Sequence, residues 1–122
     1  MKADKIENRK KADEYFQAKP ENFNCAQAVL KAFQDEFDIS EQEIAAYKAY
    51  GGGRAENGIC GALFAAKRLS KQSEKESLEK EFVSELGTIY CRELKLSGKA
   101  CLDCVRLADS LVEKEIEKAK LK

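Results

Sequence analysis

The stretch Asn24-Cys25-Ala26-Gln27-Ala28-Val29-Leu30-Lys31-Ala32-Phe33 indicates most clearly which fold this chain adopts. The Asn24 side chain can accept a hydrogen bond from the first helical turn, and Gln27 stands where it can return one to the Asn24 backbone. Apolar residues then recur at steps of three and four as far as Phe37, which is the spacing of a buried helix face. The stretch therefore predicts a core helix with a cysteine in its first turn.

The other segments repeat this helical pattern, and period-two alternation persists nowhere. Ser40 with Glu43 and Ser73 with Glu76 are further capping pairs, and Asn57 precedes another helix with a surface of small residues. The predicted helices cover about residues 4–18, 24–37, 40–50, 57–66, 73–91 and 101–119. We therefore expect an all-α fold, a compact single-domain helical bundle of about five to seven helices over residues 1–122.

The composition suits a globular protein and gives little sign of a charged partner. Of the 122 residues, 43% are hydrophobic and 36% are charged, and 22 basic residues balance 22 acidic ones. This balance leaves no basic surplus for nucleic acid. The charged segment from Met1 to Lys11 is unlike a signal peptide, and no apolar run approaches the ~18 residues that span a bilayer. We expect a cytoplasmic protein without a membrane segment, and a homo-oligomer stays open.

Five cysteines and no histidine are the strongest chemical signal of the chain. Without histidine, the usual general base and the commonest imidazole metal ligand are missing, so the chemistry of any site depends on sulfur. Cys25 and Cys60 fall near predicted helix starts, and so do Cys101 and Cys104. Backbone N–H groups at a helix start lower the pKa of a thiol and favour the thiolate. Cys91 is expected late in its helix.

The cysteine spacing leaves several interpretations open. Cys101-Leu102-Asp103-Cys104 is a C-x-x-C motif, which suits either a disulfide or a metal. Zinc sites usually combine two such motifs and this chain has one, so zinc is less expected than an iron–sulfur cluster held by four cysteines. A single cysteine on an apolar helix face is most often an inert core residue.

Glycines flank the second cysteine of the chain. Gly52 and Gly53 belong to the run Gly51-Gly52-Gly53-Arg54, and Gly58 and Gly61 surround Cys60. Such positions let the backbone approach a cofactor or substrate closely, so these four glycines are candidate cofactor-binding residues. The alternative is structural, because a glycine run ends a helix and small residues let two helices pack closely.

Taken in order, the cysteine segments are similar to those of a known family. From about Phe23 to the last helix they are Asn24-Cys25-Ala26-Gln27-Ala28-Val29, Gly51-Gly52-Gly53-Arg54, Gly58-Ile59-Cys60-Gly61-Ala62-Leu63, Cys91-Arg92-Glu93-Leu94 and Cys101. The chain resembles the C_GCAxxG_C_C family of small bacterial and archaeal proteins, whose description is a redox one. Two positions depart from the family pattern: Cys104 stands where a non-cysteine is expected, and Ala65 stands where the motif has its last glycine.

The resemblance implies four characteristic cysteines, here Cys25, Cys60, Cys91 and Cys101, and a redox role. We expect these four to form one catalytic site, either of a thiol–disulfide oxidoreductase or of an electron carrier, which serves an unidentified redox partner. In the alternative, the same four thiolates bind an iron–sulfur cluster or zinc, with Cys104 as a further candidate ligand. In a third hypothesis, the cysteines are buried residues of a non-catalytic structural or binding module.

Overall fold

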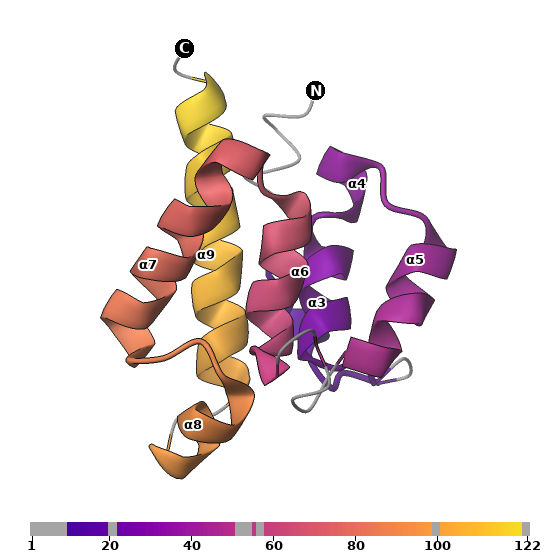
Figure 1. Ribbon diagram of the computed structural model, residues 1–122. Helices are drawn as coiled ribbons and strands as arrows, with labels where there is room; N and C mark the ends of the chain where they lie inside the picture. The colour runs from indigo at the N-terminus through magenta and orange to yellow at the C-terminus, as the bar shows by residue number, and fades with distance from the viewer. Residues whose placement is uncertain (1–9, 20–21, 51–54, 56–57, 99–100, 121–122) are drawn as a thin grey trace.

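The computed structural model describes residues 10–19, 22–50, 55, 58–98 and 101–120. Within these residues the chain forms eight α-helices, short 3-10 segments and no strand, so the all-α prediction is confirmed (Figure 1). The helices are α2 (Ala12–Tyr15), α3 (Cys25–Ala32), α4 (Gln34–Phe37), α5 (Glu41–Ala46), α6 (Gly61–Leu69), α7 (Lys75–Leu86), α8 (Cys91–Leu96) and α9 (Cys101–Lys120), and the 3-10 segments include η1 (Tyr47–Tyr50) and η3 (Gln72–Glu74).

Three helices form the centre of the bundle. α3, α6 and α9 pack against one another, α5 lies against α3, and α7 covers α6 and α9 (Figure 1). Ala62, Ala65 and Ala66 of α6 are fully buried, so α6 can approach both of its neighbours closely. The largest fully buried side chains are Val29, Leu30, Phe33, Ile44, Leu63, Phe82, Val105 and Val112. No described helix is long and apolar enough to cross a membrane.

Two of the predicted helix starts are confirmed in atomic detail. The Gln27 N–H donates to Asn24 Oδ1 at 2.8 Å, and the Asn24 N–H donates to Gln27 Oε1 at 3.1 Å. The Asn24 side-chain amide also donates to the carbonyl oxygen of Lys48 at 3.0 Å, which connects the start of α3 to η1. The Ser40 hydroxyl accepts from the Glu43 N–H at 3.0 Å and caps α5.

Other predicted boundaries are wrong. In the described part of residues 4–18, the helix is limited to Ala12–Tyr15, because Phe16 pairs with Phe23 in an isolated bridge and Gln17 takes a φ of +57°. The helix that was expected to reach Phe37 ends at Ala32, and α4 follows as a separate turn. Ser73 lies within η3 rather than capping a helix, and α7 begins at Lys75.

Candidate functional site

Gly87 decides where Cys91 lies. The Gly87 N–H donates to the Val83 carbonyl at 2.7 Å, and Gly87 takes a φ of +91°, a left-handed conformation that glycine adopts without a Cβ clash. This ends α7 at Leu86, so Cys91 is the first residue of the separate helix α8. The expectation that Cys91 lies late in a long helix is therefore wrong.

The start of α6 also differs from the expectation. Cys60 is itself the N-cap residue, and the helix begins at Gly61. The predicted cap, Asn57, lies outside the described residues. With these corrections, Cys25, Cys91 and Cys101 are each the first residue of a helix, and Cys60 stands one position earlier.

A short backbone pairing joins the segments that precede α6 and α8. Ile59 and Tyr90 form an isolated antiparallel bridge, and the Cys60 N–H donates to the Ile89 carbonyl at 2.7 Å. Successive residues of extended backbone point to opposite sides. Ile59 and Tyr90 line a surface groove, where Tyr90 is 42% exposed, and Cys60 and Cys91 are buried at 4% and 8% exposure.

Cys60 and Cys104 interact where α6 packs against α9. The Cys60 thiol donates a side-chain hydrogen bond to Cys104, which is 3% exposed and lies in the first turn of α9. This hydrogen bond is the largest cause that raises the pKa of Cys60, and burial raises it further. The N–H groups of Leu63 and Ala62 act in the opposite direction but are outweighed. The expectation that a helix start keeps this thiol's pKa low is therefore wrong.

Cys101 lies within electrostatic reach of two further cysteines. Burial is the largest cause that raises the pKa of Cys101, followed by the charge of Cys91, and the Cys60 charge adds to it. Lys95 of α8 lowers the pKa of Cys101 and partly offsets these effects. Cys101 is only partly buried, whereas the other four cysteines are buried.

Cys25 is held against the start of α6. A Cβ atom added to Gly61 would lie 2.7 Å from the Cys25 Sγ and 2.8 Å from the Tyr50 carbonyl oxygen. Gly61 therefore lets α3 and α6 meet with a sulfur between them, which supports the packing interpretation of this glycine. Gly58 takes a φ of +75°, and Gly52 and Gly53 lie outside the described residues.

Comparison with known protein families identifies a family whose profile covers most of this chain. The profile of the C_GCAxxG_C_C family, described as "Putative redox-active protein (C_GCAxxG_C_C)", matches residues 23–117. The chain belongs to the C_GCAxxG_C_C family. No curated protein and no solved structure matches it significantly. The matched range contains all five cysteines, including Cys104, which stands where the family pattern is expected to have another residue.

None of the five cysteines of this C_GCAxxG_C_C protein forms a disulfide in this structure. Within the described part of the chain, no group of three or more Cys, Asp or Glu side chains is arranged so that it could hold a metal ion.

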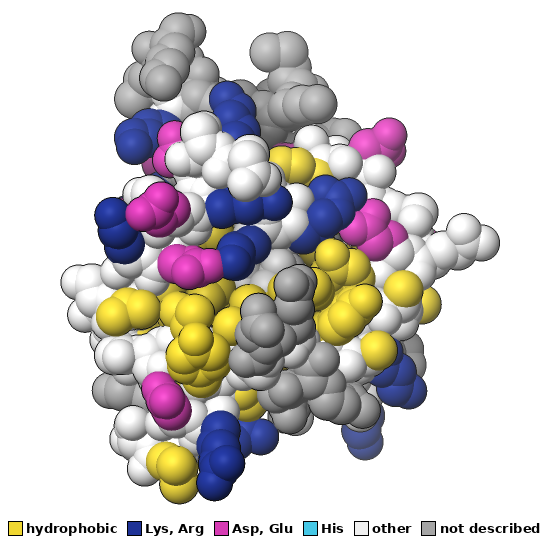
Figure 2. Space-filling view, in the orientation of Figure 1, with side chains coloured by type: hydrophobic (Ala, Val, Ile, Leu, Met, Phe, Trp, Pro, Cys, Tyr) yellow, Lys and Arg dark blue, Asp and Glu magenta, His cyan; other side chains and the backbone are white. Residues whose placement is uncertain are grey.

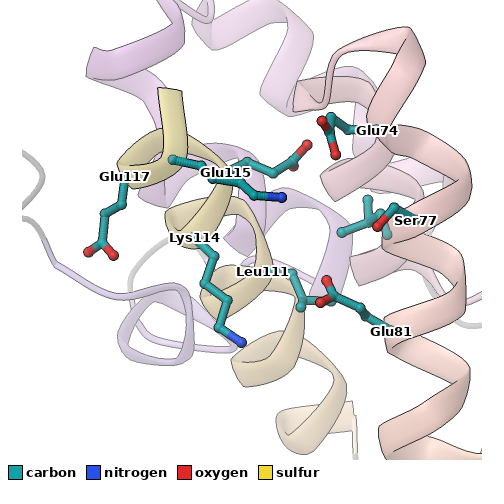
Figure 3. Close-up of a pocket in the computed structure, with 9 residues that line it drawn as sticks. Glu74, Ser77, Glu81, Leu111, Lys114, Glu115 and Glu117 are labelled. Carbon is teal, nitrogen blue, oxygen red and sulfur yellow. The ribbon is translucent and has the colours of Figure 1, made fainter. Parts of the chain in front are cut away.

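Two cavities were not indicated by the sequence. One, of about 570 Å³, is the groove beside the Ile59–Tyr90 bridge, where hydrophobic and basic side chains meet on the face shown in Figure 2; it is lined by Tyr47, Ile59, Phe64, Lys67, Arg68, Gln72, Lys75, Glu79, Ile89 and Tyr90. The other, of about 330 Å³, lies between α7 and α9, where Figure 3 shows Glu115 opposite Glu74. None of the described cysteines lines either cavity, but Ile59 and Tyr90 of the larger one directly precede Cys60 and Cys91 in the chain.

Proposed function

We propose that this C_GCAxxG_C_C protein is a thiol–disulfide redox protein in which Cys60 and Cys104 form the reactive pair. The observation that carries the proposal is that these two buried thiols lie where α6 packs against α9, with a hydrogen bond between them. On oxidation, the two sulfurs form one disulfide and release two electrons and two protons. The electrons reduce a disulfide of the substrate to two thiols, so each cycle exchanges one disulfide for another.

Burial and protonation both help to keep the Cys60–Cys104 pair reduced until it exchanges with a substrate disulfide. Cys60 and Cys104 are shielded from solvent, and the raised pKa keeps the Cys60 thiol protonated near neutral pH. Since the thiolate is the form that oxidants attack, such a pair resists random oxidation. A cytoplasmic setting, where free thiols persist, agrees with this role.

An iron–sulfur cluster is the second candidate. Its support is the position of Cys25, Cys60, Cys91 and Cys101 at four helix starts, where backbone N–H groups stabilise thiolates. Cluster binding would require these four sulfurs to deprotonate and to move together from the present arrangement. Zinc would need the same rearrangement.

Measurements on one anaerobic preparation distinguish the thiol–disulfide protein, the metal-binding protein and the structural module. The protein is purified without oxygen, and iron, zinc, acid-labile sulfide and free thiols are measured before and after mild oxidation. We expect a metal-free protein that loses two thiols reversibly, with peptide mapping that joins Cys60 to Cys104. Iron together with sulfide would instead support the cluster, and five unreactive thiols would support the structural module.

Matched variants test the identity of the pair. Cys104→Ser and Cys60→Ser should abolish the mapped Cys60–Cys104 disulfide, whereas Ser110→Ala, an exposed change on the same helix as Cys104, should leave it intact. A final wild-type disulfide that maps to two other cysteines would show that another pair reacts.

A further inference from the structure

The proposed function leaves open how a disulfide from outside reaches a buried pair. Cys60 and Cys104 are 4% and 3% exposed, and a thiolate must meet the sulfur that it attacks along an unobstructed path. Cys101 is the one cysteine with a partly exposed surface. An exchange with an external disulfide can therefore begin at Cys101 without opening the core.

The place of Cys101 in the fold connects it to the buried pair. Cys101 and Cys104 are three residues apart in α9, so their side chains lie on the same face of the helix. Cys104 in turn accepts the hydrogen bond from Cys60. The charges of Cys60 and Cys91 both act on Cys101, in agreement with the packing of α9 against α6.

Cys91 is suited to resolve a mixed disulfide that forms on Cys101. It starts α8, is 8% exposed, and its charge is the largest one that acts on Cys101. A buried thiol close to an exposed one can resolve a mixed disulfide that forms on the exposed one. Lys95 of the same helix acts on Cys101 in the opposite direction and favours its thiolate.

We propose that Cys101 is the attacking cysteine of a two-pair relay, in which Cys91 resolves the mixed disulfide and the Cys60–Cys104 pair supplies the electrons. The inference rests on the proposed thiol–disulfide function and adds the order of events and the point of contact with the substrate. Its substrate class is a disulfide that is presented from outside the core at the starts of α8 and α9.

The steps balance in atoms and electrons. The Cys101 thiolate attacks an external disulfide R–S–S–R, forms a mixed disulfide and releases one R–S⁻. Cys91 attacks the Cys101 sulfur, forms the Cys91–Cys101 disulfide and releases the second R–S⁻. Cys60 then attacks Cys101 and frees Cys91, and Cys104 attacks Cys60 and frees Cys101. The net change is one Cys60–Cys104 disulfide and two R–SH, because the protons of the two thiols pass to the released thiolates.

Oxidised glutathione serves as the probe, with mass spectrometric mapping of every cysteine. In the wild-type protein we expect two glutathione thiols released per Cys60–Cys104 disulfide. In Cys91→Ser, glutathione should accumulate on Cys101. In Cys101→Ser, the Cys60–Cys104 disulfide should form about tenfold more slowly or worse, because the exposed sulfur is gone. Circular dichroism verifies that each variant is folded.

A small oxidant separates failure of the relay from failure of the proposed function. Diamide is small enough to test the buried pair directly, so Cys101→Ser should still form the Cys60–Cys104 disulfide with it. If Cys101→Ser reacts with oxidised glutathione as fast as the wild type, or if glutathione settles on another cysteine in Cys91→Ser, the relay is wrong. If no variant and no oxidant gives a Cys60–Cys104 disulfide, the proposed function itself is wrong.

Discussion

The Cys25 sulfur fills the space that a side chain on Gly61 would need. A Cβ at Gly61 would meet the Cys25 Sγ at 2.7 Å and the Tyr50 carbonyl oxygen at 2.8 Å, both closer than real Cβ contacts. The first of these contacts involves a side chain and the second involves backbone. Cys25 is thereby fixed beside Cys60, the residue before Gly61 in the chain.

The first prediction concerns this contact. Gly61→Ala should destabilise the protein by about 1–3 kcal/mol, because the added methyl group overpacks a site that is already filled. Urea denaturation under reducing conditions measures the change. Cys25→Ala should partly rescue it, since the double variant removes the sulfur but leaves the Tyr50 carbonyl in place. If the two changes are simply additive, the contact does not determine how α3 packs on α6.

The second prediction concerns the Asn24 cap. Asn24→Ala should cost about 1–2 kcal/mol of stability, because it removes the bond from the Gln27 N–H and the bond to the Lys48 carbonyl. Ser40→Ala is the matched control, since Ser40 caps a helix that carries no cysteine. We expect the alkylation rate of Cys25 to rise in Asn24→Ala and to stay unchanged in Ser40→Ala. Equal alkylation rates of Cys25 in the two variants would mean that the Asn24 cap does not control the accessibility of Cys25.

The third prediction concerns alkaline pH. The pKa of Cys60 is raised in the folded protein by its hydrogen bond to Cys104 and by burial, so folding favours the protonated thiol. The resulting stabilisation is fully present below the ordinary thiol pKa of about 8.5 and is lost as pH rises above it, by at most about 1.4 kcal/mol per pH unit for one proton. Urea midpoints between pH 7 and pH 9.5 measure this slope without oxygen.

Cys60→Ser serves as the control for the pH experiment, because a serine hydroxyl does not ionise in this range. The wild-type slope should exceed the slope of the variant. Parallel slopes would mean that Cys60 ionises as easily in the folded chain as in the unfolded one, contrary to its buried hydrogen bond.

The fourth prediction concerns Lys95. Its charge lowers the pKa of Cys101, so Lys95→Met should slow the alkylation of Cys101 at pH 7.5 by about two- to fivefold, the size expected for an exposed charge. Lys80→Met is the control, because Lys80 lies on α7 and pairs with Glu76. Iodoacetamide labelling followed by peptide mapping gives the rate at Cys101. An equal effect of both lysines would point to net charge rather than to the local contact.

The fifth prediction concerns the cavity between α7 and α9 (Figure 3). Burial raises the pKa of Glu115, and the like charges of Glu74 and Glu81 raise it further. The Ser70 hydroxyl, which donates to the Glu115 Oε2 at 2.6 Å, lowers this pKa and only partly offsets them. The charged form is therefore disfavoured in the folded state. Glu115→Gln, which keeps an acceptor for Ser70, should raise stability at pH 7 by well under about 1 kcal/mol, since the group is only partly buried and solvent screens its charge.

The pH dependence of the stability of Glu115→Gln shows whether the charge of Glu115 destabilises the folded protein. The folded pKa of Glu115 lies above its ordinary value of 4.5, so the advantage of Glu115→Gln should be absent well below pH 4.5 and should grow as pH rises through the two pKa values. Thermal unfolding at pH 4, 5, 6 and 7 follows this change. An advantage that is independent of pH would assign the gain to packing instead of charge.

Local signals in the sequence were enough for the fold class and for part of the site. Asn24 and Gln27 interact within one turn, so their spacing alone predicts the start of α3 correctly. The end of α7 also depends on a local residue, Gly87. Helical periodicity on both sides of this glycine outweighed it in the prediction, and Cys91 was therefore assigned to the wrong end of a helix.

The relationship between Cys60 and Cys104 is long-range, and spacing along the chain carries no information on it. It depends on how α6 and α9 pack, which is set by the small buried residues of α6. The same holds for the raised pKa of Cys60, because the position at a helix start is visible in the sequence but the burial and the thiol partner are not.

The contact between Cys60 and Cys104 also couples the redox state to the lifetime of the chain. A disulfide there would close a loop that contains α6, α7 and α8, and on a chain-entropy argument such a closure restricts the unfolded ensemble by about 4 kcal/mol. Proteases cleave chains that open, so the oxidised protein would survive digestion longer than the reduced one. The rate at which the protein is degraded would then depend on how reducing its compartment is.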